Sequence, residues 1–160
     1  MYSPDKITGF WRGTYIYDAP ELRPADGGGV NFEMHLTQGW WQGIFGRFSG
    51  IVSEDVSRGM PGTGTIRGGL TRGEIRFTKQ MPVAHVIHDG QVVAIEDLLR
   101  PRGVAVRAGS IPHSPIYYSG TFDSDSTAFG VWRIEPDIVR VADGLNLRTT
   151  GSTGTFTLTR

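Results

Sequence analysis

The sequence predicts an all-β protein: an eight-stranded antiparallel up-and-down β-barrel with long loops at one end. Apolar and polar residues alternate in eight segments bounded by turn signals, which is the pattern of half-buried strands. Only residues 92–99 could form a short helix, and Pro101 would end it. The eight predicted strands are residues 7–18, 29–38, 44–53, 61–70, 74–80, 115–122, 128–135 and 152–160.

The connections between these strands alternate in length. Hairpin-sized turns follow the second, fourth and sixth strands, and long connections follow the others. Because alternate connections of an antiparallel meander lie at opposite ends, all long connections should fall at one end of the barrel. This arrangement predicts a cup whose open mouth is formed by residues 19–28, 54–60, 81–114 and 136–151.

Composition favours one domain spanning residues 1–160, with no nucleic-acid partner and no membrane partner. Lysine plus arginine and aspartate plus glutamate number 16 each, so the formal net charge is zero. The chain has no cysteine, which excludes a disulfide framework and a thiolate metal site. Without an apolar run of spanning length or a leader-like start, we expect a cytoplasmic protein.

Both ends of the chain carry residues of a known barrel signature. The first predicted strand opens with Gly9-Phe10-Trp11, and the last one ends at Arg160. This pattern resembles the calycin superfamily of lipocalins, fatty-acid-binding proteins and avidins. The resemblance implies that Trp11 plugs the closed end and that Arg160 packs across it. The alternative is another closed or sandwiched β-fold with Trp11 as an ordinary core residue.

The resemblance to the avidins does not extend to their ligand. After Trp11 the chain continues Arg12-Gly13-Thr14-Tyr15, where the avidin pattern carries an asparagine and a serine for the biotin ring. Biotin is therefore disfavoured.

Strand alternation counted from Trp11 predicts which side chains point into the barrel. The inward set is mostly apolar and aromatic, as in a small-molecule pocket. The predicted ligand-binding residues are Tyr15, Tyr17, Met34, Phe48, Phe77, Lys79, Tyr118 and Trp132. Tyr17 and Lys79 would lie near the mouth and suit an anionic or carbonyl-bearing head group. The alternatives are a barrel filled by its own side chains and a Lys79 that reaches solvent.

The longest predicted loop contains three histidines, His85, His88 and His113. They could hold a metal or haem, but their spacing matches no recognised ligand pattern. We expect solvated loop histidines, no metal, no cofactor and no catalytic residue.

Trp40 and Trp41 lie in a predicted turn at the closed end. Two indoles on a short turn expose apolar area, which predicts a homo-oligomer interface. Alternatively, one of them folds back across the barrel floor beside Trp11.

The favoured function is binding of a small hydrophobic or amphipathic molecule in the mouth, without catalysis. One alternative is an isomerase, cyclase or hydratase that uses the same cavity, with histidines or tyrosines as acid and base. The other is a filled-core barrel that acts as an assembly module. A cavity would argue against the assembly module, and a hydrogen-bonded His–Tyr or His–Asp pair facing it would favour the enzyme.

Overall fold

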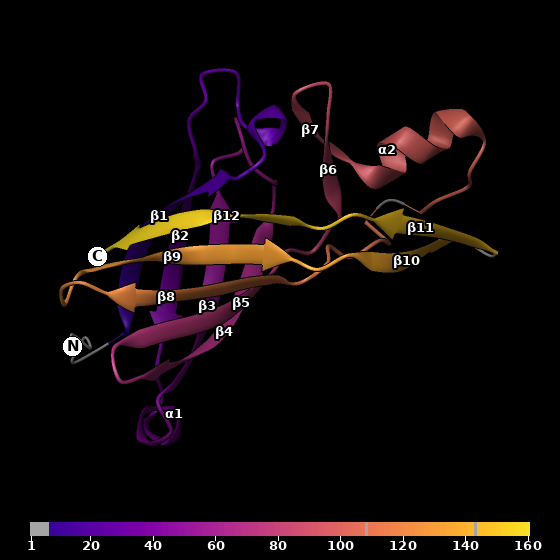
Figure 1. Ribbon diagram of the computed structural model, residues 1–160. Helices are drawn as coiled ribbons and strands as arrows, with labels where there is room; N and C mark the ends of the chain where they lie inside the picture. The colour runs from indigo at the N-terminus through magenta and orange to yellow at the C-terminus, as the bar shows by residue number, and fades with distance from the viewer. Residues whose placement is uncertain (1–6, 108, 143) are drawn as a thin grey trace.

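The computed structural model, which describes residues 7–107, 109–142 and 144–160, is built around a closed antiparallel barrel of eight strands (Figure 1). Neighbouring strands follow the closed order β1-β12-β9-β8-β5-β4-β3-β2. This confirms the predicted fold class. The barrel strands are β1 (Gly9–Tyr17), β2 (Val30–Thr37), β3 (Arg47–Glu54), β4 (Thr63–Thr71), β5 (Glu74–Gln80), β8 (Ile116–Phe122), β9 (Thr127–Ile134) and β12 (Ser152–Thr159).

The remaining elements lie in the connections. Two hairpins, β6–β7 and β10–β11, and the helix α2 project beyond one end of the barrel, and α1 lies at the other end (Figure 1). The predicted helix over residues 92–99 is helical only in its second part, because β7 occupies the first. The bounds are α1 (Trp40–Ile44), β6 (His85–His88), β7 (Gln91–Ala94), α2 (Ile95–Leu99), β10 (Asp137–Ala142), β11 (Leu145–Thr149), and 3-10 turns at Pro20–Leu22 and Arg100–Arg102.

Side-chain alternation builds the wall of the barrel. Every second residue of β2 is buried, from Val30 to Leu36, and the residues between them are exposed. Aromatic rings fill the interior where small residues leave room. A Cβ at Gly13 would lie 2.2 Å from the ring of Phe32, so glycine is what admits this ring to the barrel centre.

Trp11 and Arg160 meet at the closed end, as predicted. The guanidinium carbon of Arg160 lies 5.8 Å from the centre of the Trp11 ring, and Nη2 donates to the Thr8 carbonyl at 3.0 Å. Trp11 is fully buried, and its Nε1 donates to the Ile7 carbonyl at 2.8 Å. The ring of Phe122 packs edge-on against the indole at 5.9 Å. The closed end is therefore sealed by side chains.

A second, smaller core organises the mouth. Ala84, Ile95, Ile111 and Val141 form a buried cluster that joins residues before β6, α2, the segment before β8, and β10. Apolar burial of this kind holds long connections in place against their conformational entropy. The mouth thus carries ordered structure that covers part of the barrel opening.

None of the helices in the described ranges combines the length and apolar composition that crossing a bilayer requires.

Candidate functional site

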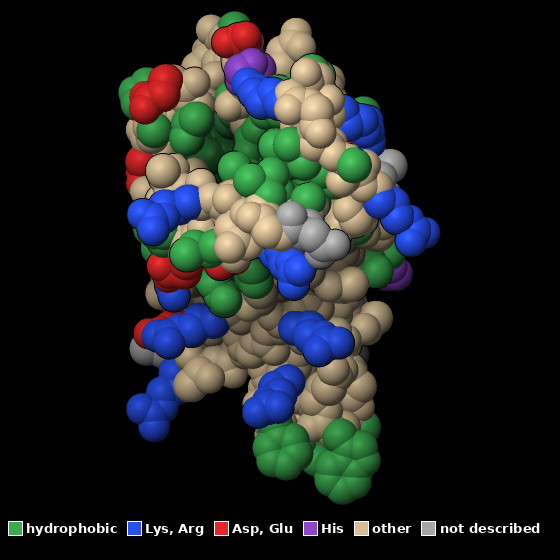
Figure 2. All heavy atoms as spheres, turned by 90° about the vertical axis from the view of Figure 1, so that its right-hand side faces the viewer, with side chains coloured by type: hydrophobic (Ala, Val, Ile, Leu, Met, Phe, Trp, Pro, Cys, Tyr) green, Lys and Arg blue, Asp and Glu red, His purple; other side chains and the backbone are tan. Residues whose placement is uncertain are grey.

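A cavity of about 1340 Å³ lies at the mouth of the barrel. Residues from all four long connections line it together with the last residues of β1 and β9, and Figure 2 shows the opening as a hollow with hydrophobic side chains inside. Ligand pockets in proteins usually enclose roughly 300–1,000 Å³, so this one is large enough for a small organic molecule. Its position matches the predicted open mouth.

Aromatic side chains from three strands form the deepest part of the cavity wall. Tyr15, Tyr17, Tyr118 and Trp132, four of the predicted ligand-binding residues, all line it. The ring centres of Tyr17 and Trp132 are 4.9 Å apart, and those of Tyr15 and Trp132 are 5.6 Å apart, both in edge-to-face contact. Edge-to-face contact is a preferred arrangement of aromatic rings. This part of the wall is therefore an aromatic surface of mutually packed rings.

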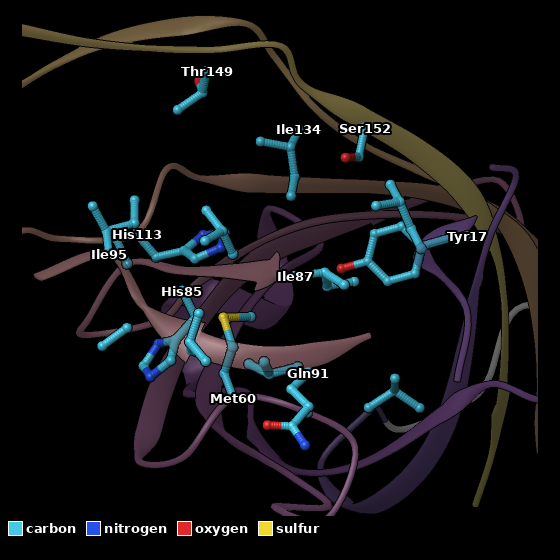
Figure 3. Close-up of a pocket in the computed structure, with 18 of the residues that line it drawn as sticks. Tyr17, Met60, His85, Ile87, Gln91, Ile95, His113, Ile134, Thr149 and Ser152 are labelled. Atoms are coloured by element: carbon cyan, nitrogen blue, oxygen red, sulfur yellow. The ribbon is translucent and has the colours of Figure 1, made fainter. Parts of the chain in front are cut away.

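Most of the remaining wall comes from the mouth connections, and Ile134 of β9 and Ser152 of β12 complete it (Figure 3). None of these side chains was predicted to bind the ligand, and for those in the connections the reason is that loop conformation does not follow from strand alternation. Figure 3 shows Met60, His85, Ile87, Gln91, Ile95, His113, Ile134, Thr149 and Ser152 around the same space as Tyr17.

The Tyr17 hydroxyl and the His113 imidazole are among the polar groups around this space, with the side chains of His85, Gln91, Thr149 and Ser152 (Figure 3). Burial, together with the negative charge of Glu54, raises the pKa of Tyr17 to about 12, so the phenol is neutral at pH 7. Burial also lowers the pKa of His113. Its Nδ1 lies 2.6 Å from the Ser114 carbonyl, which can only accept, so Nδ1 carries the proton and Nε2 is an acceptor.

Lys79 does not line the cavity. Its side chain is fully buried and forms an ion pair with the equally buried carboxylate of Glu54. Glu54 also accepts hydrogen bonds from the Tyr15 hydroxyl at 3.2 Å and from the Met60 backbone N–H at 2.6 Å. The expected lysine at the mouth is thus a neutralised charge inside the barrel, and the alternative of a solvent-reaching Lys79 is also wrong.

Glu54 was missed because the third strand was predicted to end at residue 53. The alternation that buries Phe48 and Val52 continues to Glu54 and turns it inward. The sequence did contain a signal for the ion pair: Glu54 and Lys79 both fall at inward-facing strand positions, and buried charges of opposite sign are usually paired.

Three other predicted ligand-binding residues lie in the packed part of the barrel. Met34, Phe48 and Phe77 are buried, belong to the main core and are not among the residues that line the cavity. The ring of Phe77 stacks on Tyr118 with the two planes 7° apart and the centres at 4.5 Å. These residues support the cavity from below.

Of the three loop histidines, which were expected to be solvated, His113 is buried, so that expectation is wrong for this residue. Within the described ranges no three histidine, cysteine or acidic side chains come together as metal ligands. His85 and His113 line the cavity, whereas His88 lies at the hairpin turn, with its Nε2 3.5 Å from the exposed carboxylate of Asp89. The acid–base pair that would favour an enzyme is not seen at His113, which is bonded to a backbone carbonyl.

Trp40 and Trp41 are both exposed, by 72% and 66% respectively. The alternative in which one indole folds back beside Trp11 is therefore wrong.

The fold and the cavity define this chain as a closed eight-stranded β-barrel with one sealed end and one cavity-bearing end. Comparisons with protein-family models, characterised proteins and solved structures found no match.

Proposed function

We propose that this protein binds a small hydrophobic or amphipathic molecule in the mouth cavity and that it belongs to the calycin-like barrels. The observation that carries the proposal is the cavity of about 1340 Å³ above a sealed floor. The Trp11–Arg160 contact at the opposite end supports the calycin assignment.

The polar groups within the cavity favour a ligand with a neutral hydrogen-bonding group. Tyr17 offers a hydroxyl and His113 an acceptor nitrogen, and Glu54 neutralises the charge of Lys79 beneath them. The exposed arginines Arg102 and Arg148, which also line the cavity, would meet an anionic end of the ligand at the solvent side, whereas Arg58 is paired with Asp26. An amphipathic molecule satisfies both regions.

The two rival functions have less support. A filled-core assembly module would have no cavity at the mouth. A His–Tyr or His–Asp pair facing the cavity would favour an enzyme, and at His113 the observed partner of Nδ1 is the Ser114 carbonyl instead.

Binding of a neutral apolar probe, N-phenyl-1-naphthylamine, tests the proposal. Trp132 is the tryptophan that lines the cavity, so a bound probe should quench its emission. Replacing Ile134, which also lines the cavity, by tryptophan should narrow the space and weaken binding about tenfold, which corresponds to about 1.4 kcal/mol.

Ile51→Trp is the matched control, because Ile51 is 54% exposed on the outer wall of the barrel. This variant should bind the probe like the wild type. Equal affinity of the Ile134→Trp and Ile51→Trp variants would rule out the mouth cavity as the site. Native mass spectrometry of protein isolated from its own host should reveal the natural ligand by its mass.

A further inference from the structure

The short helix α1, between β2 and β3 at the closed end, turns its apolar side chains toward solvent. Trp40, Trp41, Ile44 and Phe45 are exposed by 72, 66, 58 and 70%; we call these four residues the aromatic tip. The two indoles contact each other edge-on with ring centres 4.5 Å apart. Surface helices of globular proteins usually bury their apolar side, so α1 has the opposite arrangement.

Polar side chains hold α1 in this orientation. Oε1 of Gln42 accepts a hydrogen bond from the Gly39 N–H at 2.9 Å, and its Nε2 donates to the Ser49 hydroxyl at 3.4 Å. Nε2 of Gln38 donates to the Arg47 carbonyl at 3.0 Å. The glutamines thus face the barrel, and the aromatic tip faces away from it.

The barrel wall beside the aromatic tip is basic. Arg47 begins β3, Arg67 lies on β4 and Arg72 in the turn after it, and all three are exposed. The end of β4 adjoins α1, since the Leu70 N–H donates to the Gly46 carbonyl at 2.6 Å. Figure 2 shows basic side chains on the wall above the green aromatic groups at its lower edge.

The carboxylates of the neighbouring strands do not neutralise these arginines. Glu33 on β2 lies 3.6 Å from Arg12, and Glu74 on β5 lies 3.4 Å from Arg76. Among the described residues no carboxylate lies within salt-bridge distance of Arg47, Arg67 or Arg72. The formal net charge of the chain is zero, but Arg47, Arg67 and Arg72 form a local positive surface.

We propose that the aromatic tip docks this protein on an anionic lipid surface, with the indoles in the headgroup region and the three arginines at the lipid phosphates. Tryptophan favours the membrane–water interface because its ring is apolar and its N–H is polar. Basic residues beside an exposed apolar helix add electrostatic attraction to anionic lipid. This inference is independent of the proposed function.

A second copy of the chain fits this surface less well. Aromatic side chains bury about 150–250 Å² each, so three of them and Ile44, already partly covered, offer roughly 500 Å². A stable dimer buries about 800 Å² per partner. A symmetric pairing of two tips would also bring two sets of unpaired arginines together, which is unfavourable.

Vesicle co-sedimentation of the full chain tests the proposal. We expect binding to vesicles of phosphatidylcholine with phosphatidylglycerol at low salt, weaker binding in 0.5 M NaCl, and little binding to pure phosphatidylcholine. Trp11 and Trp132 are buried, so a blue shift of the emission on binding reports Trp40 and Trp41. Trp40→Ala/Trp41→Ala should abolish binding.

The arginines are tested by a matched pair of variants. Arg47→Gln/Arg67→Gln/Arg72→Gln should weaken binding to anionic vesicles on the order of a hundredfold, at about fivefold per arginine. Arg100→Gln/Arg107→Gln/Arg133→Gln removes the same number of charges from exposed positions away from the aromatic tip and should leave binding unchanged. Equal binding of the two variants, or no vesicle binding by the wild type, would overturn the proposal. A dimer in sedimentation velocity that the double alanine variant abolishes would also overturn it, in favour of self-association.

Discussion

Replacing Glu54 by glutamine should destabilise the protein severely. Both side chains of the Lys79–Glu54 pair are fully buried, so glutamine would leave the ammonium group without its carboxylate. What remains near Lys79 Nζ are the rings of Tyr15 and Phe32, at 4.9 and 5.2 Å. Removing one partner of a buried ion pair costs about 3–5 kcal/mol of the free energy of unfolding.

The loss of free energy of unfolding in Glu54→Gln should become smaller as the pH rises. Burial lowers the pKa of Lys79, and the charge of Glu54 opposes this effect. In the variant the folded protein should therefore hold a neutral amine at pH values where the unfolded chain still binds the proton. Stability of the variant should rise with pH, by up to about 1.4 kcal/mol per unit, between the folded pKa of Lys79 and roughly 10.4, its unfolded value.

Urea unfolding at pH 7 and pH 9 measures both effects. The control is Glu33→Gln, which breaks the exposed pair with Arg12 and should cost less than about 1 kcal/mol without this slope. Lys79→Met leaves Glu54 two hydrogen-bond donors, and Glu54→Gln/Lys79→Met should cost less than the sum of the single variants. A loss below about 1 kcal/mol for Glu54→Gln, independent of pH, would refute the buried ion pair.

Three further changes test other parts of the barrel by urea unfolding. Gly13→Ala should cost about 1–3 kcal/mol because its Cβ would meet a ring carbon at 2.2 Å, whereas Gly43→Ala, whose Cβ would lie 3.8 Å from its nearest neighbour, should be tolerated. Arg160→Met should cost about 1 kcal/mol, since it removes the contact with the first-strand indole and a hydrogen bond. Burial is the main cause of the lowered pKa of His113, so the free energy of unfolding should fall as the pH drops below about 6.5. His113→Gln should reduce this dependence on pH. An unchanged dependence would refute the lowered pKa of His113.

Strand positions could be predicted because the barrel interior enforces a period of two. All eight predicted strands are present, and the extra hairpins lie in the long connections. Those hairpins were not predicted because each strand has only four to six residues, too few for alternation to stand out. They are stabilised by the second core, which depends on contacts between Ile95, Ile111 and Val141, far apart in the sequence.

The site was predictable in its location and only partly in its residues. Loop lengths placed it at the mouth, and strand alternation identified Tyr17 and Trp132. Alternation gives the face of a strand but not the depth at which a side chain lies, so it could not separate Phe77 in the floor from Tyr17 in the wall. The ion-pair partner of Lys79 was not predicted because Glu54, the last residue of β3, lies one residue beyond the predicted end of the third strand.

The same antiparallel order determines how the two proposed surfaces relate. The aromatic tip lies in the connection between β2 and β3, one of the three at the closed end, and the four long connections all lie at the mouth. Trp11 and Arg160 seal the closed end, which separates the cavity from the aromatic tip. Docking through Trp40 and Trp41 would therefore leave the mouth facing water, and a ligand could enter or leave the cavity while the protein stays on the lipid surface.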